Sequence, residues 1–114
     1  MTNAEVLVVF VTVGDEEEAL KIAKTVVEEN LAACANMVPR IRSIYRWKGE
    51  MYDEQEILLI MKTRTALFNS LQSRVRELHS YETPEIIGFP LTHGMPDYMR
   101  WVLESTLWTP GVGV

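Results

Sequence analysis

Hydrophobic and polar positions recur with two different periods along the chain, which divides it into strand-like and helix-like segments. Residues 6–11 are a continuous, mostly β-branched apolar run, typical of a strand inside a sheet that is covered on both faces. Residues 15–28 instead carry apolar positions at helical spacing, with Asp15 as the predicted N-cap. The buried stripe of this helix is predicted to consist of Ala19, Ile22, Ala23, Val26 and Val27.

The middle of the chain has the pattern of one long β-hairpin. Residues 31–38 are a strand-like run of mostly small side chains, and Pro39 marks a bulge or an edge position. Polar and apolar residues alternate over 41–47, Lys48-Gly49 supplies a turn, and residues 55–63 form the return strand. Large side chains surround this turn, where solvent is expected: Tyr45, Trp47, Met51 and Tyr52. Such an arm favours pairing with another chain, so the pattern predicts an oligomer.

The last third of the chain predicts a helix, a strand and a second, shorter helix. Thr65 is the expected N-cap of the first helix, which ends at His79. Its predicted buried stripe consists of Leu67, Phe68, Leu71, Val75 and Leu78. Residues 84–91 form a fourth strand, and Pro96 suits the first position of the short helix. In that helix one face is expected to carry Tyr98, Trp101, Val102 and Ser105.

This order of elements predicts an α+β fold class, a ferredoxin-like βαββαβ sandwich with an extended hairpin between its second and third strands and a C-terminal helix. Right-handed crossovers place the first and third strands centrally, in agreement with their continuous apolar runs. The length of 114 residues allows one domain, which we assign to residues 1–108. Residues 109–114 carry no pattern and are interpreted as a flexible C-terminal tail.

Charge and cysteine content narrow the class of protein. The 11 Lys and Arg residues against 16 Asp and Glu residues give a formal charge of −5, which argues against a nucleic-acid-binding protein. One cysteine cannot form an internal disulfide, and the first residues lack the basic region of a signal peptide. The apolar run at residues 6–11 is far shorter than the roughly 20 residues that cross a bilayer. We therefore expect a cytoplasmic protein without nucleic-acid or membrane partners.

Five short segments appear in a fixed order along the chain: ENLAACAN at 29–36, SIYRWKG at 43–49, LIMKT at 59–63, HSYETPE at 79–85 and YMRW at 98–101. Together they resemble the CutA family of divalent-cation tolerance proteins. The resemblance extends from about residue 5 to residue 107. It implies a cytoplasmic homotrimer of ferredoxin-like subunits whose hairpin arms join sheets across the interfaces.

The resemblance also implies copper binding and tolerance to divalent metals, with no established enzymatic reaction, so we do not expect an enzyme. In the family, copper is attributed to a cysteine near the end of the first strand and to two adjacent histidines before a Tyr-x-x-Pro-Glu segment. Here the first-strand position holds Val11 or Thr12, and the histidine pair is replaced by Leu78-His79. We therefore expect Cu(II) or another divalent cation to bind weakly.

His79 and Cys34 are the candidate metal ligands. His79 ends the second helix, where a protonated imidazole would also complement the helix dipole, so a structural role stays open. Cys34 is the only thiol and suits a soft metal, but among alanines it also fits a small buried side chain. Tight metal sites usually need three or four protein ligands, so a strong site would have to be shared between chains.

Lys62, Tyr81 and Glu85, together with Tyr45 and Trp47 from the arm, are candidates for a polar cleft between subunits. Lys62 is a cation near the end of an apolar strand, and Glu85 is its expected partner. The alternative is an interface salt bridge with aromatic packing. The leading functional hypothesis is metal binding in divalent-cation tolerance. A sensor that holds a small anion or metabolite in the cleft comes second, and a structural scaffold third.

Overall fold

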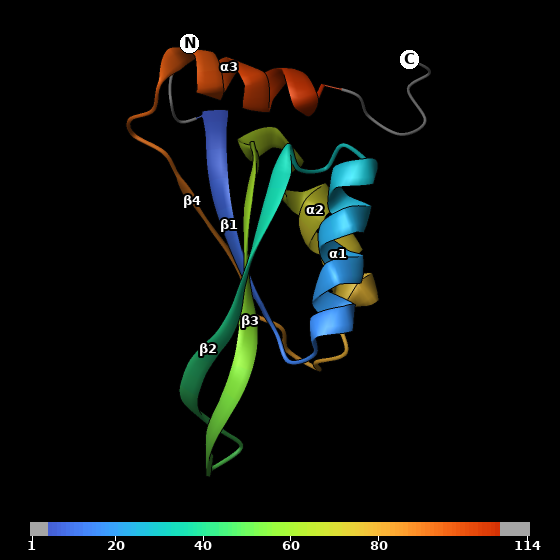
Figure 1. The fold of residues 1–114 in the computed structure, drawn as a ribbon, viewed down its shortest axis with the longest axis vertical. Coiled ribbons are helices and arrows are strands. Elements are labelled where there is room, and N and C mark those ends of the chain that lie inside the picture. Colours follow the sequence, from blue (N-terminus) through green and yellow to red (C-terminus); the bar gives the residue numbers. More distant parts are fainter. Residues whose placement is uncertain (1–4, 108–114) are drawn as a thin grey trace.

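The computed structural model describes residues 5–107, and Figure 1 shows their arrangement. Within this range the helices and strands are β1 (Val6–Val13), α1 (Glu16–Glu28), β2 (Cys34–Trp47), β3 (Glu50–Arg64), the 3-10 turn η2 (Thr65–Leu67), α2 (Phe68–Leu78), β4 (Ile86–Pro90) and α3 (Pro96–Ser105). The predicted tail at residues 109–114 lies outside the described residues.

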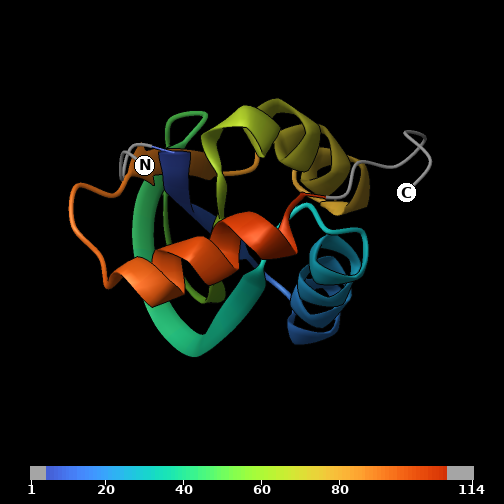
Figure 2. The ribbon, with the colours of Figure 1, turned by 90° about the horizontal axis from the view of Figure 1, so that it is seen from above.

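The four strands form one antiparallel sheet in the spatial order β2-β3-β1-β4. β1 and β3 are therefore central, as their apolar runs predicted. α1 and α2 cover one face of the sheet, and α3 lies across the end at which β1 begins (Figures 1 and 2). The predicted α+β class with a ferredoxin-like βαββαβ order and a C-terminal helix is confirmed.

The main core lies between the sheet and the helix pair α1 and α2. Alternate side chains of the two central strands are fully buried there, including Val9, Val11, Leu59 and Met61. The predicted stripe of α1 is buried except for Val27, which is 38% exposed. A second cluster beneath α3 consists of Val6, Ala33, Met99 and Val102. Burial of these apolar surfaces holds the helices to the sheet.

The opposite face of the sheet is covered by α3 only at the end where β1 begins, where Val6 packs against Met99 and Val102 (Figure 1). Phe10 and Phe89 pack edge to face on it, with 5.2 Å between the ring centroids. Ile87 and Phe89 are 51% and 42% exposed. The expectation that β1 is covered on both faces is met over its first half, where Val6 and Val8 are buried on this face, whereas Phe10 and Thr12 further along are only half-buried in a single chain.

The hairpin is longer than predicted because β3 already begins at Glu50. Lys48 and Gly49 form its turn, with φ angles of 51° and 83°. The predicted bulge is present, since Val38 pairs with Leu58 whereas Ile41 pairs with Glu56, so the register shifts by one residue. Beyond this bulge the hairpin projects past the helices (Figure 1), and we call residues 41–56 the arm.

β2 begins at Cys34, three residues later than predicted. The preceding residues close the end of α1 instead, because the N–H groups of Leu31 and Ala32 both donate to the carbonyl of Val26. Asn30 has a φ of 59° in this turn, a conformation that asparagine tolerates better than most residues.

The prediction that Thr65 caps the second long helix was wrong. Residues 65–67 form η2, and α2 begins at Phe68 without a side-chain cap. Leu71 and Val75 are nevertheless fully buried in the predicted stripe. α3 begins at Pro96 as predicted, but its buried residues are Met99 and Val102, whereas Tyr98 and Trp101 are exposed. None of the helices within residues 5–107 is long and apolar enough to span a bilayer.

Candidate functional site

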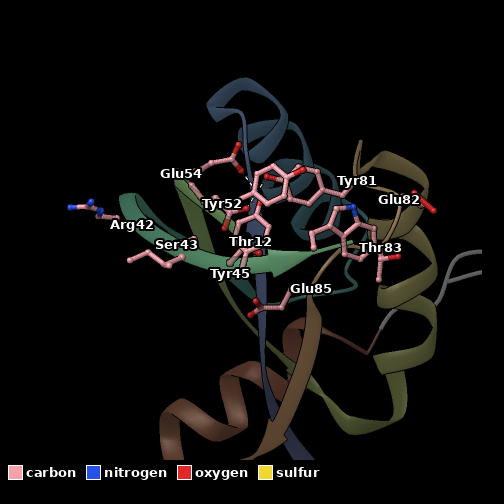
Figure 3. A pocket seen from close by; sticks show the side chains of 13 residues that line it. Thr12, Arg42, Ser43, Tyr45, Tyr52, Glu54, Tyr81, Glu82, Thr83 and Glu85 are labelled. Atoms are coloured by element: carbon pink, nitrogen blue, oxygen red, sulfur yellow. Dashed lines mark hydrogen bonds between the residues drawn. The ribbon is translucent and has the colours of Figure 1, made fainter. Parts of the chain in front are cut away.

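A cavity of about 770 Å³ lies at the base of the arm, on the face of the sheet opposite α1 and α2 (Figure 3). We call it the arm pocket. Aromatic and acidic side chains dominate its lining, which consists of Thr12, Arg42, Ser43, Ile44, Tyr45, Trp47, Tyr52, Glu54, Glu56, Tyr81, Glu82, Thr83 and Glu85. The predicted cleft residues Tyr45, Trp47, Tyr81 and Glu85 therefore meet in one place.

The strand pairing within the arm determines where the lining side chains of residues 42–56 lie. Tyr45 lies opposite Tyr52 in the register, and their rings stack at a centroid distance of 5.3 Å with an interplanar angle of 13°. The Tyr45 hydroxyl donates a 2.5 Å hydrogen bond to Glu54. This bond favours the neutral phenol and raises the pKa of Tyr45 to about 12.

Tyr81 reaches the pocket from the loop between α2 and β4 (Figure 3). Its hydroxyl donates a 2.8 Å hydrogen bond to Glu56, a carboxylate that is only 5% exposed. Burial, and then this hydrogen bond, raise the pKa of Tyr81 above its usual value. A Cβ on Gly14 would lie 2.5 Å from the Tyr81 hydroxyl oxygen, so the glycine leaves room for this side chain.

His79 holds the backbone from which Tyr81 projects. Its side chain is fully buried, Nε2 donates to the carbonyl of Thr12 at 2.8 Å, and Nδ1 accepts the N–H of Tyr81 at 3.1 Å. Because a carbonyl only accepts, the ring is assigned as the neutral tautomer with its proton on Nε2. A metal ion at His79 would have to displace one of these two hydrogen bonds.

Glu18 ties the same loop to the start of α1. Its Oε2 accepts the Ser80 N–H at 3.1 Å and the Ser80 hydroxyl at 3.2 Å, and it lies 3.6 Å from Nδ1 of His79. The loop that carries Tyr81 is therefore held by the backbone carbonyl of Thr12 in β1 and by the side chains of Glu18 in α1 and His79 at the end of α2.

The charge of the pocket lining is negative, since four glutamates face one arginine. Arg42 is already neutralised by Asp53, with two hydrogen bonds of 2.8 and 2.6 Å, and it points away from the aromatic rings (Figure 3). Glu82 pairs with Lys48 at 3.3 Å. Within residues 5–107, Glu54, Glu56 and Glu85 have no ion pair. This arrangement favours a cationic ligand over the small anion expected from the sequence.

Lys62 does not line the arm pocket. It lies opposite Val8 and Cys34 in the sheet, and its ammonium group donates to the side chain of Asn36. The expected contact with Glu85 is absent because Glu85 precedes Ile86, which pairs with Val11, three residues further along β1 than Val8. The sheet register therefore separates Lys62 from the other four predicted cleft residues.

Cys34 is half-buried, with its sulfur 3.7 Å from the hydroxyl oxygen of Tyr98. Burial, and then this contact, raise the pKa of Tyr98 to about 12. Cys34 and His79 belong to different parts of the fold, since Cys34 is in register with Val8 and His79 bonds to Thr12. Among residues 5–107 no group of three or more His, Cys, Asp or Glu side chains is placed to hold a metal ion.

Sequence reasoning missed several residues of the pocket, above all Glu56 and Tyr52. The alternation of the arm carried part of the signal, because residues 43, 45 and 47 share a face. Which side chains of the return strand join them depends on the bulge at Val38/Ile41, whose exact position the sequence does not specify.

An antiparallel β2-β3-β1-β4 sheet with two helices on one face and a projecting arm defines a ferredoxin-like α+β protein with a pocket at the base of its arm. Residues 7–105 match the profile of the family described as CutA1 divalent ion tolerance protein. The chain belongs to this family.

Two relatives illustrate the similarity. The chain is 50% identical over 99 residues to the divalent-cation tolerance protein CutA of Thermus thermophilus, covering 87% of this chain and 96% of that protein. The solved structure of Cut A1 from the same organism matches with a TM-score of 0.86, covering 89% of this chain and 98% of that one. The chloroplastic CutA protein of Arabidopsis thaliana is 44% identical over 100 residues, which are 88% of this chain and 55% of that protein. The chain thus spans about half the length of the plant relative.

Proposed function

We propose that this chain contributes to divalent-cation tolerance as a cytoplasmic, non-enzymatic homotrimer that binds divalent metal ions weakly, copper among them. The observation that carries this proposal is the excess of negative charge in the lining of the arm pocket, where Glu54, Glu56 and Glu85 have no cationic partner within residues 5–107. Membership of the family of divalent ion tolerance proteins supports the same reading.

Assembly into a homotrimer is part of the proposal for two reasons. The face of the sheet opposite α1 and α2 exposes Ile87 and Phe89, and the arm exposes Ile44 and Met51, which are both 62% exposed. Apolar surface of this kind favours burial against another chain. The described part of one chain also offers no cluster of three metal ligands, so a stronger site needs ligands from more than one chain.

Copper titration with matched variants tests the metal proposal. We expect Glu54→Gln combined with Glu85→Gln to weaken Cu²⁺ binding in calorimetry. Glu28→Gln combined with Glu104→Gln makes the same change in net charge on exposed helix positions and is expected to leave binding unchanged. Equal binding by the two double variants would contradict the pocket as the site.

His79→Ala and Cys34→Ala test the two ligands proposed from the sequence. If one of these variants loses copper binding while the pocket double variant retains it, the site lies at that residue instead. Native mass spectrometry with elemental analysis reports the number of subunits and the bound metal together. A stable monomer at all concentrations would contradict the trimer.

A second candidate function is binding of a small molecule in the arm pocket, as in a sensor. The volume of about 770 Å³ and the four aromatic side chains in the lining favour this candidate, because ligand pockets are typically ~300–1,000 Å³ and largely aromatic or apolar. A thermal-shift screen of charged and neutral metabolites tests it. No shift from any compound would count against this candidate and leave the metal proposal untouched.

A further inference from the structure

We propose that the arm pocket binds a small organic cation, an alkylammonium group, between the buried carboxylate of Glu56 and the rings of Tyr45, Tyr52 and Tyr81. This inference rests on the second proposed function, binding of a small molecule in the arm pocket, and names the class of that molecule.

The first argument is the state of Glu56. This residue is 5% exposed and lines the pocket, but its described contacts include one hydrogen bond to a single carboxylate oxygen, Oε2, from Tyr81. Within residues 5–107 no lysine or arginine lies within ion-pair distance of it. A buried carboxylate is costly unless it is paired, so a positive ligand gains the attraction that the chain itself does not supply.

The second argument is the aromatic wall. Figure 3 shows the rings of Tyr45, Tyr52 and Tyr81 gathered on one side of the pocket, and the Tyr45 and Tyr52 rings stack at 5.3 Å. The faces of aromatic rings carry negative potential and attract ammonium groups within about 6 Å. Rings combined with an unpaired carboxylate therefore select a cation with a hydrophobic surface.

The third argument is an ammonium group that the chain already places beside this pocket. Lys48 Nζ lies 5.5 Å from the centroid of the Trp47 ring and 3.3 Å from the carboxylate of Glu82. Trp47 and Glu82 both line the arm pocket. At the edge of the pocket, one aromatic ring and one carboxylate thus hold the alkylammonium group of Lys48. Tyr81 and Glu56 provide a second combination of aromatic ring and carboxylate further inside the pocket.

The same contacts favour an organic cation over a bare metal ion. Hydroxyl hydrogens of Tyr45 and Tyr81 point at Glu54 and Glu56, so each of these carboxylates already has one oxygen engaged. Hard divalent cations need about six oxygen ligands, and the described residues contain no cluster of three metal-ligating side chains. A cavity of about 770 Å³ is also far larger than an ion.

Calorimetry with tetraethylammonium chloride tests the inference on the full chain in its native assembly, at physiological salt. The uncharged control of similar size is 3-ethyl-3-pentanol. We expect the ammonium to bind and the alcohol to bind at least roughly tenfold more weakly. Glu56→Gln, which keeps an acceptor for Tyr81, is expected to weaken ammonium binding by roughly tenfold, whereas Glu28→Gln, a matched loss of one negative charge on α1, leaves it unchanged.

Each other outcome overturns the inference in a distinguishable way. Equal affinity for the ammonium and the alcohol would show an apolar pocket without charge selection. Equal weakening by Glu56→Gln and Glu28→Gln would show that only the net charge matters. A thermal-shift hit from an anion or a neutral metabolite, without ammonium binding, would keep the small-molecule function and reject the cation. Binding of Cu²⁺ in the pocket without ammonium binding would reject it in favour of the metal proposal.

Discussion

The hydroxyl of Tyr81 donates a 2.8 Å hydrogen bond to the carboxylate of Glu56, and this contact joins the loop before β4 to the base of the arm. The two residues are 25 positions apart in the sequence. His79 accepts a hydrogen bond from the backbone N–H of Tyr81, and Gly14 leaves space for its hydroxyl, so the contact depends on three separate segments of the chain.

Removal of the Tyr81 hydroxyl should lower the stability of the fold. In Tyr81→Phe the buried carboxylate of Glu56 loses its hydrogen-bond donor, and we expect a loss of about 1–3 kcal/mol in the free energy of unfolding. Tyr52→Phe is the matched control, because the described contact of Tyr52 is the stacking of its ring. It should change stability by less than about 0.5 kcal/mol in the same urea titration. Equal losses in both variants would contradict a special role of the Tyr81 hydroxyl.

Tyrosine ionisation should weaken the arm pocket at alkaline pH. The folded pKa of Tyr45 is raised from 10.0 to about 12, and that of Tyr81 is raised as well. A raised folded pKa means that the stabilisation is complete below pH ~10 and is lost as the pH rises through the folded pKa. Absorbance of tyrosinate should therefore show Tyr45 titrating near pH 12 in the folded chain. Because the pKa of Tyr98 is also raised to about 12, Tyr45→Phe should lower the amplitude of the step near pH 12 without abolishing it, and ionisation of Tyr45 near pH 10 would contradict the prediction.

His79 should be required for stability in a way that the second histidine is not. His79→Ala leaves the N–H of Tyr81 and the carbonyl of Thr12 without their partner and opens a buried cavity. We expect a loss of about 2–4 kcal/mol in the free energy of unfolding, measured by denaturant titration. His93→Ala is the control, since His93 is exposed, and it should have almost no effect. A stable His79→Ala chain that loses only bound copper would instead favour a ligand role.

Gly14→Ala should act through Tyr81. The new Cβ would lie 2.5 Å from the hydroxyl oxygen of Tyr81 but 3.3 Å from the next ring atom, Cζ. We expect Gly14→Ala to destabilise the chain by about 1–3 kcal/mol, and to do so less in a Tyr81→Phe background, where the closest atom is missing. A double-mutant cycle of unfolding free energies measures this coupling. Additive effects of the two substitutions would show that they do not meet.

The order of elements and the central position of β1 and β3 followed from the sequence. Hydrophobic periodicity is a local signal, and it specified the buried stripe of α1, the Asp15 cap and the turn at Gly49 without knowledge of the rest of the chain. The error at Thr65 has the opposite origin. A threonine before an apolar stripe is typical of an N-cap, but here Leu67 is buried in η2 and Phe68 packs against the main core, and α2 begins at Phe68.

For the candidate site, the sequence singled out Tyr45, Trp47, Tyr81 and Glu85, and tertiary structure decided that they meet. It also decided that Lys62 lies elsewhere, bonded to Asn36, and that Glu56 takes the central position. The sequence specifies which side chains are present, but which of them meet across the sheet depends on the register in which the strands pair.

The bulge between Val38 and Ile41 is the clearest physical reason for this division. With unbroken pairing, residue 44 would lie opposite Tyr52; the shift by one residue puts Tyr45 there instead. By itself the sequence determined the family of folds and the chemistry carried by the arm. The register, set by long-range pairing and by the loop that holds Tyr81, decided which of those side chains form an acidic, aromatic pocket.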